Sequence, residues 1–340
     1  MRRALCIMLA VMMLFSLVAC RGSLTVAEDN KTKVDDIARV DTSGDISDNT
    51  TSDNSRTTEM SDATRELLDS INVDNAEAMG FCGADITWYY MNNVLVLKGT
   101  GRMTDFSSDG RPYENVLPSV NRVIIEDGIT YVSASAFCEE DGIAAVYLSN
   151  TLEEIGKYAF FSCNGLTSIN IPDSVTYIDD MAFDGCTGLT RVDISDIAAW
   201  CNISFSSHPF IDGIGSLYLN NNIVTDLVIP NEVTKIRKYV FCGCTSLTSI
   251  NIPDSVTSIE SGAFYRCTGL TSINIPDSVT SIGYRAFYEC TGLTSITIPD
   301  SVTSIGEDAF DGCTGLTIYY HSSAVDEIVS EYPEFNWVKQ

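Results

Sequence analysis

The sequence is poor in the residues on which enzymes and nucleic-acid-binding proteins depend. Histidine occurs only at His208 and His321, and 20 Lys and Arg residues stand against 46 Asp and Glu residues, which gives a formal net charge of -26. A protein that binds a phosphate backbone needs an excess of basic side chains to displace counterions, so this charge argues against a nucleic-acid partner. It also argues against docking on anionic lipid by charge alone.

Catalytic motifs are missing as well. The sequence contains no His-Glu-x-x-His zinc motif, no Gly-x-Ser-x-Gly nucleophile turn, no phosphate-binding glycine loop and no cysteine with an evident histidine partner. Acidic residues are numerous, but no pair of carboxylates is marked out for acid-base chemistry. We therefore predict a protein that is not an enzyme and that binds no cofactor.

Long hydrophobic runs are confined to the N-terminus. A Met-Arg-Arg start is followed by an apolar run over residues 4–18 and by the sequence Leu-Val-Ala-Cys, which ends at Cys20. This arrangement indicates an export signal over residues 1–19. The last four residues resemble the lipobox of bacterial lipoproteins, and the resemblance implies cleavage before Cys20 and lipidation of that residue. The alternative is an ordinary signal peptide with an incidental cysteine. No later stretch approaches the roughly 20 apolar residues that span a bilayer.

Residues 20–79 have the composition of a tether. Ser, Thr, Asp and Asn dominate stretches such as 45–55, and aromatic residues are few. Such a segment buries too little apolar surface to fold alone, so we expect the lipidated Cys20 to be followed by a disordered acidic linker. An r.m.s. span of roughly 40–45 Å would hold a folded head away from a membrane.

The rest of the chain is built from repeats of 23 residues. Six cysteines mark the period, in two runs: Cys163 and Cys186, then Cys244, Cys267, Cys290 and Cys313. Repeats of this length stack into a solenoid in which each unit contacts only its neighbours. We expect the solenoid to occupy residues 129–315.

One repeat shows how the chain turns. Apolar residues at Leu270, Ile273 and Ile275 alternate with polar ones and predict a short strand, which Pro276 ends because proline has no N–H for the ladder. Further along the repeat, the residues expected to point into the core are Val279, Ile282, Ala286, Phe287 and Cys290.

The ends and one internal segment depart from the repeat. Residues 80–128 contain two β-rich runs around an Asn-Asn pair and predict an N-terminal β-hairpin cap. Residues 316–340 are aromatic enough to predict a C-terminal cap. An irregular insertion at about 197–223 adds 12 residues to the period and carries Trp200. It is either a functional elaboration or a second hairpin on the convex side.

Cysteines in an exported protein are able to form disulfides. Neighbouring rungs lie about 4.8 Å apart, whereas bridged Cβ atoms lie near 3.8 Å, so we expect buried free thiols in the repeats. Cys138 and Cys242 fall outside the periodic ladder and are expected to be more exposed. A zinc site at Cys242-Gly-Cys244 lacks a usual ligand spacing.

Aspartates also recur in register, at Asp173, Asp254, Asp277 and Asp300. Stacked carboxylates sometimes hold calcium, but an aspartate after proline is ordinary turn chemistry. We predict no metal.

Two surfaces are candidates for binding. Positions beside Ala-Phe vary between repeats, and the strip that carries aromatic and arginine anchors comprises Tyr265, Arg266, Tyr284, Arg285 and Tyr288. The alternative explanation is that these exposed positions vary because no function constrains their side chains. A second candidate is the concave face, whose polar residues are Ser249, Asn251, Ser272 and Asn274. These side chains solvate the strands and suit hydrogen bonds to sugars or to an extended peptide.

Over residues 81–339, the pattern Ala-Phe-x-x-Cys-x-x-Leu-x-x-Ile-x-Ile-Pro-x-x-Val-x-x-Ile resembles BspA-like leucine-rich-repeat proteins of bacterial surfaces. The resemblance implies a right-handed, α/β-type leucine-rich-repeat solenoid, exported, lipid-anchored to the bacterial envelope and exposed at the surface. It also implies adhesion through protein contacts, to host extracellular matrix or to another bacterial surface. The alternatives are a surface glycan-binding protein for nutrient capture and a structural envelope spacer.

Overall fold

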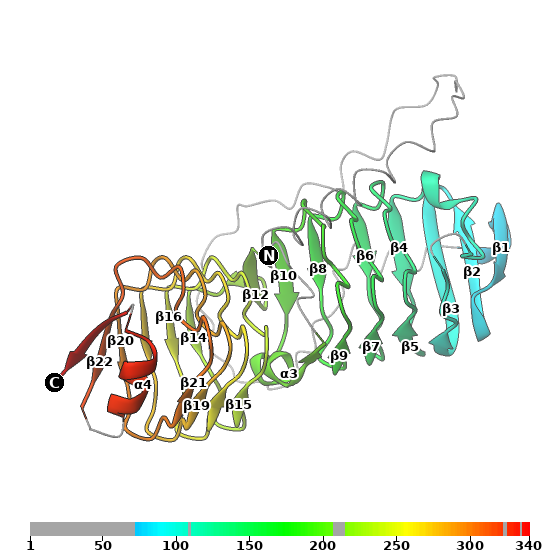
Figure 1. The fold of residues 1–340 in the computed structure, drawn as a ribbon. Helices are drawn as coiled ribbons and strands as arrows, with labels where there is room; N and C mark the ends of the chain where they lie inside the picture. The colour runs from blue at the N-terminus through cyan, green and yellow to red at the C-terminus, as the bar shows by residue number, and fades with distance from the viewer. Residues whose placement is uncertain (1–71, 108–109, 207–214, 322–324, 334) are drawn as a thin grey trace, which may run out of the picture. The chain divides into compact units, whose positions relative to one another are not determined.

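A computed structural model describes residues 72–107, 110–206, 215–321, 325–333 and 335–340. The chain divides into two units, Met1–Asn54 and Ser55–Gln340, and every described residue lies in the second (Figure 1). The expected export signal, Cys20 and most of the expected tether fall outside the described residues. The end of that tether region is folded, because a short 3-10 helix, Val73–Asn75, is followed by strand β1, Ala78–Phe81.

The second unit is a stack of rungs, and each regular rung carries two short strands. The first strands of successive rungs are β4 (Arg122–Ile125), β6 (Ala145–Tyr147), β8 (Ser168–Asn170), β10 (Arg191–Ile194) and β12 (Ser216–Leu219), then β14 (Asp226–Val228), β16 (Ser249–Asn251), β18 (Ser272–Asn274), β20 (Ser295–Ile298) and β22 (Thr317–Tyr320). The second strands are β5 (Ile129–Val132), β7 (Glu154–Ile155), β9 (Tyr177–Ile178) and β11 (Ser204–Phe205), then β15 (Lys235–Ile236), β17 (Ser258–Ile259), β19 (Ser281–Ile282) and β21 (Ser304–Ile305).

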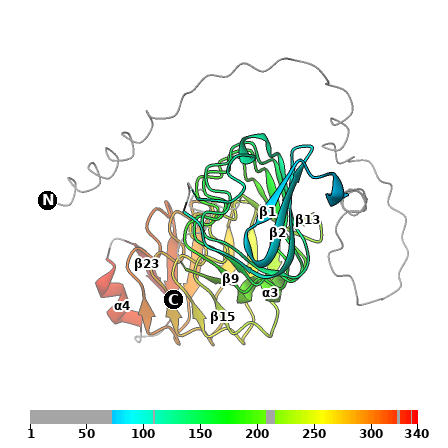
Figure 2. The same cartoon turned by 90° about the vertical axis from the view of Figure 1, so that its right-hand side faces the viewer.

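Pairing between rungs is parallel and follows the sequence period. Ser249 lies opposite Ser272, and Ile259 lies opposite Ile282, each 23 residues further on. The predicted 23-residue solenoid is therefore confirmed (Figures 1 and 2). The α/β label overstates its helix content, because the helices of the described residues are short and the regular rungs return through turns.

A third segment closes each rung, and it uses left-handed backbone at two positions four residues apart. Tyr158 and Ser162 have φ angles of 57° and 55°, and Arg285 and Glu289 have φ angles of 53° and 54°. The N–H groups at these positions point to the next rung, as where Ser162 donates to the Asp184 carbonyl at 2.8 Å. Left-handed backbone costs a residue with a Cβ about 1–2 kcal/mol. Glycine occupies the register of Ser162 in three other rungs, at Gly185, Gly243 and Gly312.

Columns of phenylalanine and cysteine fill the core. The rings of Phe264 and Phe287 stack with centroids 5.3 Å apart, and the next pair, Phe287 and Phe310, lies 5.5 Å apart. Five of the six ladder thiols, all but that of Cys244, donate to the phenylalanine carbonyl 26 residues earlier, as where Cys290 Sγ lies 3.0 Å from the Phe264 oxygen. The described cysteines are free, as predicted for the ladder. Cys138 is partly exposed as expected, but Cys242 is buried, which corrects that prediction.

The N-terminal hairpin is confirmed as an element. Strand β2 (Gly83–Met91) pairs antiparallel with β3 (Val94–Met103) through a turn in which Asn92 and Asn93 have φ angles of 49° and 65°. Asparagine tolerates this left-handed backbone. Strand β3 then pairs in parallel with both β4 and β5, so the hairpin joins the first rungs directly. A 3-10 helix, Leu117–Ser119, precedes β4.

At the other end, helix α4 (Asp326–Glu331) leads to strand β23 (Asn336–Lys339), which pairs in parallel with β22. The Phe335 ring meets Phe310, the last ring of the column, edge-on at 5.8 Å. The Tyr332 hydroxyl donates to the Ile305 carbonyl at 2.8 Å. These contacts are those that a cap requires, and capping at both ends remains a prediction.

The predicted insertion interrupts both sheets. Helix α3 (Ile197–Asn202), capped by the Asp196 side chain, stands between β10 and β11, and the indole N–H of buried Trp200 donates to the Val240 carbonyl at 2.9 Å. Strand β13 (Asn222–Ile223) turns back along β12 as an antiparallel hairpin. The expected hairpin exists, but it extends the first-strand sheet instead of lying on the opposite side. Strand β14 then begins a new sheet.

We expect Phe287→Ala to destabilise its own rung by about 3–5 kcal/mol, because it leaves a cavity between two stacked rings. In a stack held by nearest-neighbour contacts, amide hydrogen exchange should accelerate mainly in that rung and the two beside it. Thr291→Ala, at an exposed position of the same rung, is the control. Equal acceleration from β3 to β22 would show a single cooperative unit instead.

Replacing a left-handed residue by glycine should stabilise the stack. Ser162→Gly removes the strain of a Cβ on left-handed backbone but raises the conformational entropy of the unfolded chain, which opposes the gain. We expect the free energy of unfolding to rise by about 0.5–1 kcal/mol in net terms. Ser168→Gly, in strand β8, should lose a similar amount. Urea denaturation of both variants measures the difference, and a loss of stability in Ser162→Gly would contradict the assignment of strain.

Candidate functional site

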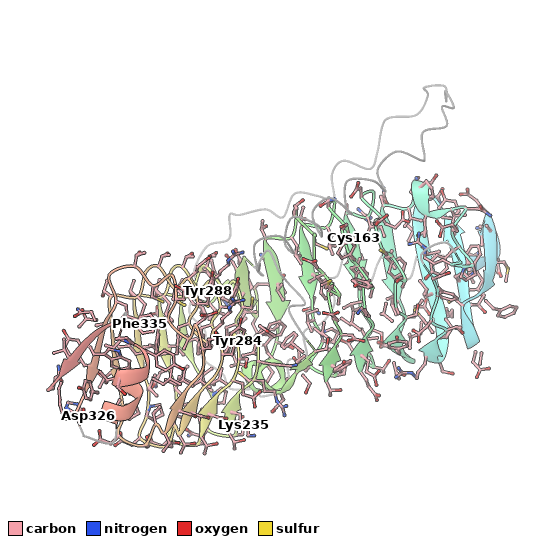
Figure 3. The ribbon with its side chains drawn as sticks, in the orientation of Figure 1. Cys163, Lys235, Tyr284, Tyr288, Asp326 and Phe335 are labelled. Carbon is pink, nitrogen blue, oxygen red and sulfur yellow. The ribbon has the colours of Figure 1, made fainter. Side chains whose placement is uncertain are left out.

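The predicted aromatic and arginine strip forms one continuous cluster on the third segments of neighbouring rungs. Tyr265 and Tyr288 are equivalent positions 23 residues apart, and their rings stack with centroids 5.0 Å apart and planes inclined by 6°. Tyr284 is 39% exposed, which makes it one of the most exposed large hydrophobic side chains of the described residues. Figure 3 labels Tyr284 and Tyr288 in the same region of the stack.

Both arginines of the strip lie against its rings. The Arg285 guanidinium carbon lies 4.8 Å from the ring centroid of Tyr284 and 5.0 Å from that of Tyr288. The Arg266 guanidinium carbon lies 5.3 Å from the Tyr265 centroid. Cation–π contacts at exposed sites are worth about 0.5–1 kcal/mol each. These contacts therefore favour the arrangement of rings and guanidinium groups seen here in the absence of a partner.

Each arginine also forms an ion pair with the next rung. Arg266 Nε lies 2.8 Å from a Glu289 oxygen, and Arg285 Nη2 lies 3.0 Å from an Asp308 oxygen. These side chains are about one third exposed, so each pair adds little to stability. The hydrogen bond from Arg266 to Glu289 raises the pKa of that guanidinium further. The pairs fix the direction of the arginines more than they strengthen the fold.

Tyr239 belongs to this cluster, and sequence reasoning left it out of the strip. Burial raises the pKa of the Tyr239 hydroxyl, and the charges of Tyr284 and Arg285 also act on it. Its ring lies over Gly262, where an added Cβ would stand 2.3 Å from a ring carbon. The glycine in the next rung makes room for the ring, but a glycine alone does not show which ring occupies that space.

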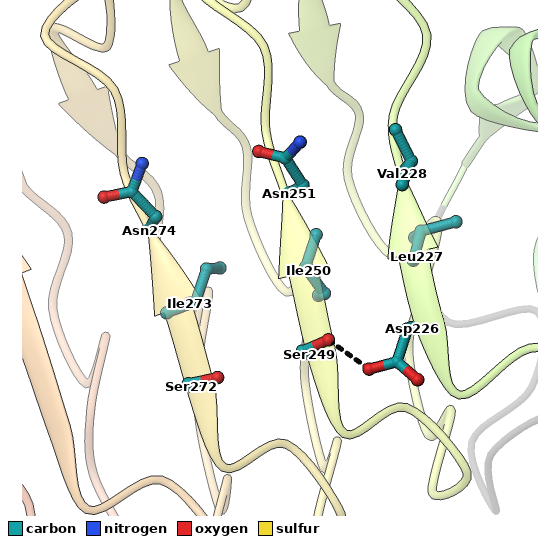
Figure 4. A pocket seen from close by; sticks show the side chains of 9 residues that line it. All are labelled: Asp226, Leu227, Val228, Ser249, Ile250, Asn251, Ser272, Ile273 and Asn274. Atoms are coloured by element: carbon teal, nitrogen blue, oxygen red, sulfur yellow. Dashed lines mark hydrogen bonds between the residues drawn. The ribbon is translucent and has the colours of Figure 1, made fainter.

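The predicted Ser and Asn face lines a hollow of about 370 Å³ (Figure 4). Ser249 and Ser272 stand on one side, and Asn251 and Asn274 stand on the other. Strand β14 adds three residues that the sequence did not single out as a binding surface, Asp226, Leu227 and Val228. The structure therefore brings the four predicted residues together and extends their surface by one rung.

The described residues offer no group of three or more His, Cys, Asp or Glu side chains able to hold a metal ion. At Cys242, burial raises the thiol pKa to about 12, which disfavours the thiolate that zinc requires. His208 lies outside the described residues. Among the helices that the structure describes, none is long and apolar enough to cross a membrane.

Comparison with known proteins gives a family match. The model of the BspA type leucine rich repeat region matches residues 113–210 and 212–332 in six copies. No curated protein sequence matches the chain.

Solved structures that are similar to this chain are also repeat proteins. One is a leucine-rich repeat protein from Eubacterium ventriosum, with 20% identity, a TM-score of 0.46, and coverage of 73% of this chain and 79% of that one. Another, from Bacteroides ovatus, has 17% identity, a TM-score of 0.39, and coverage of 71% and 84%.

A third is a leucine rich cell surface protein from Faecalibacterium prausnitzii, with 21% identity, a TM-score of 0.32, and coverage of 77% and 98%. The family model covers more than half of the chain, in the same rungs that carry the Phe and Cys columns. The chain therefore belongs to the BspA-type leucine-rich-repeat family.

Proposed function

We propose that this protein is a protein-binding module displayed on a bacterial cell and used for adhesion to host matrix or to a neighbouring cell. The observation that carries the proposal is the Tyr and Arg cluster. It gathers the residue types that most often dominate binding energy at interfaces, at exposed positions where neighbouring repeats with the same apolar frame differ. Leucine-rich-repeat proteins as a class are interaction scaffolds, which supports the same function.

The rigidity of the cluster favours binding. A partner that meets Tyr265, Tyr284 and Tyr288 need not order them, because stacking, cation–π contacts and ion pairs already hold them. Immobilising a flexible side chain costs about 0.5–1.5 kcal/mol, so preordered anchors retain more of their contact energy. Arg266 and Arg285 also have left-handed backbone, which strains a residue with a Cβ but not a glycine such as Gly185 or Gly243. Arginines that occupy these positions despite the strain support a role for their side chains.

Display at the surface rests on the N-terminal sequence. Lipidation of Cys20 would anchor the chain, and the segment that follows would carry the solenoid away from the membrane. Several acyl chains on one residue exceed the two signals that stable anchoring requires. Cys20 and the segment after it lie outside the described residues, so a separate variant tests the anchor.

We expect replacement of Tyr265, Arg266, Tyr284, Arg285 and Tyr288 by Ala to weaken binding to the protein partner at least tenfold, about 1.4 kcal/mol. The measurement is surface plasmon resonance of the full chain over immobilised fibronectin, laminin and collagen. Tyr284→Ala alone, at the most exposed ring, should give part of the loss without disturbing the stack.

The matched control is Lys157→Ala with Tyr158→Ala, because that pair has the same design on an N-terminal rung. Lys157 Nζ lies 4.9 Å from the Tyr158 centroid and 2.9 Å from an Asp180 oxygen. The control should bind like the unmodified chain. Equal losses in both variants, or no binding to any matrix protein, would count against the cluster as the adhesive surface.

We expect Cys20→Ala to leave the precursor uncleaved and free of acyl label, since the lipid is attached at this residue in the proposed form. Metabolic labelling with palmitate and partition into detergent measure the outcome. Labelling that persists in the variant would refute the anchor.

A further inference from the structure

We infer that the hollow on the first-strand face is a second binding site, which takes a short extended peptide carrying a Lys or Arg side chain. This site lies on β14, β16 and β18 and does not include any residue of the Tyr and Arg cluster. It goes beyond the proposed adhesive surface and does not depend on it.

One end of the hollow carries an acid, Asp226, that forms no ion pair with a described residue. Asp226 is exposed, and its carboxylate accepts hydrogen bonds from the Ser249 hydroxyl and from Thr225 Oγ1 at 3.0 Å. The Ser249 bond, followed by the Thr225 bond, lowers the pKa of this carboxyl, which keeps it ionised. Within the described part of the chain, no basic side chain forms an ion pair with Asp226. A carboxylate that is held by hydroxyl groups but has no basic partner suits a cationic side chain of a ligand.

Two amides line the opposite side. Asn251 and Asn274 occupy equivalent positions on neighbouring rungs, and neither side chain has a hydrogen bond to another residue that the structure describes. A primary amide can donate to the C=O and accept from the N–H of one extended residue, because both groups of such a residue point to the same side. The three strands of the hollow, β14, β16 and β18, span two rung steps of roughly 10 Å in all, which is the length of about three extended residues. The hollow is therefore long enough for a short extended peptide.

Val228 gives the site an apolar contact on the strand that carries the acid, at the side of the two amides (Figure 4). It stands in the register where later rungs carry Asn251 and Asn274, and it is 65% exposed. Among the strands that the structure describes, β14 pairs with β16 alone. Since Ile229 N–H donates to the Asn251 carbonyl, the N–H and C=O groups of Asp226 and Val228 point to the open side. A bound chain can reach the hollow from there.

The chemistry favours a peptide over a sugar. None of the nine residues that line the hollow is aromatic, and sugar rings are commonly bound against an aromatic face. An ionised carboxylate beside an exposed valine instead fits a basic side chain next to an apolar one. The strong negative charge of the whole chain also attracts a cationic ligand.

The test uses the full chain labelled with nitrogen-15 at Asn side chains, whose Asn251 and Asn274 signals are assigned with Asn251→Ser and Asn274→Ser. The probes are acetyl-Ala-Val-Lys-Ala-amide, its Glu counterpart and cellotriose. We expect the Lys peptide to shift both signals saturably below about 10 mM, at least fivefold more tightly than the Glu peptide. Asp226→Asn should remove that preference.

Asp277→Asn is the matched control, because it removes the same charge from an exposed turn outside the hollow. It should leave both peptide affinities unchanged. The five-alanine variant of the Tyr and Arg cluster should also keep the response, which separates this site from the adhesive surface. Equal response to the Lys and Glu peptides, no response to either, or a response to cellotriose alone would overturn the proposal.

Discussion

The structure depends on one constraint, which is that each strand residue of a regular rung lies beside its own equivalent 23 residues later. Parallel pairing imposes this, as where Ile259 lies opposite Ile282 and Asn251 opposite Asn274. Like side chains then accumulate in columns. Phenylalanine rings stack, and hydroxyls and amides form rows, because the register permits no other neighbour. An ion pair between rungs needs opposite charges at positions one period apart, which Arg266 and Glu289 provide.

The periodic part of the fold could be predicted from sequence for this reason. Once the strand and the core positions of a single repeat were assigned, Ile273, Phe287 and Cys290 fixed the environment of their equivalents in every regular rung. The hairpin at Asn92 and Asn93 could also be predicted, because two asparagines between β-rich runs favour a turn with left-handed backbone. These features depend on local chemistry or on the repeat itself.

The features that were not predicted from sequence occur where the repeat is interrupted or where side chains of different rungs meet. Cys242 was expected to be more exposed because it stands outside the cysteine ladder, yet it is buried. Asp226 and Val228 became part of a hollow only because the insertion ends one sheet and lets β14 begin another. Tyr239 joined the aromatic cluster through the space above Gly262, and a glycine in another rung gives no hint of which ring will use it.

Columns of identical side chains stabilise the stack. They distinguish poorly between ligands, since each rung offers a ligand the same chemistry. Recognition must therefore use positions where one rung differs from the next. The Tyr and Arg cluster is such a departure on the third segments, and the Asp226 and Val228 pair is another at the first rung after the sheet break. Both departures cost the fold little stability, because side chains at exposed positions change without disturbing the buried Phe and Ile columns. A repeat protein of this kind can thus keep its core constant while each surface acquires a different ligand.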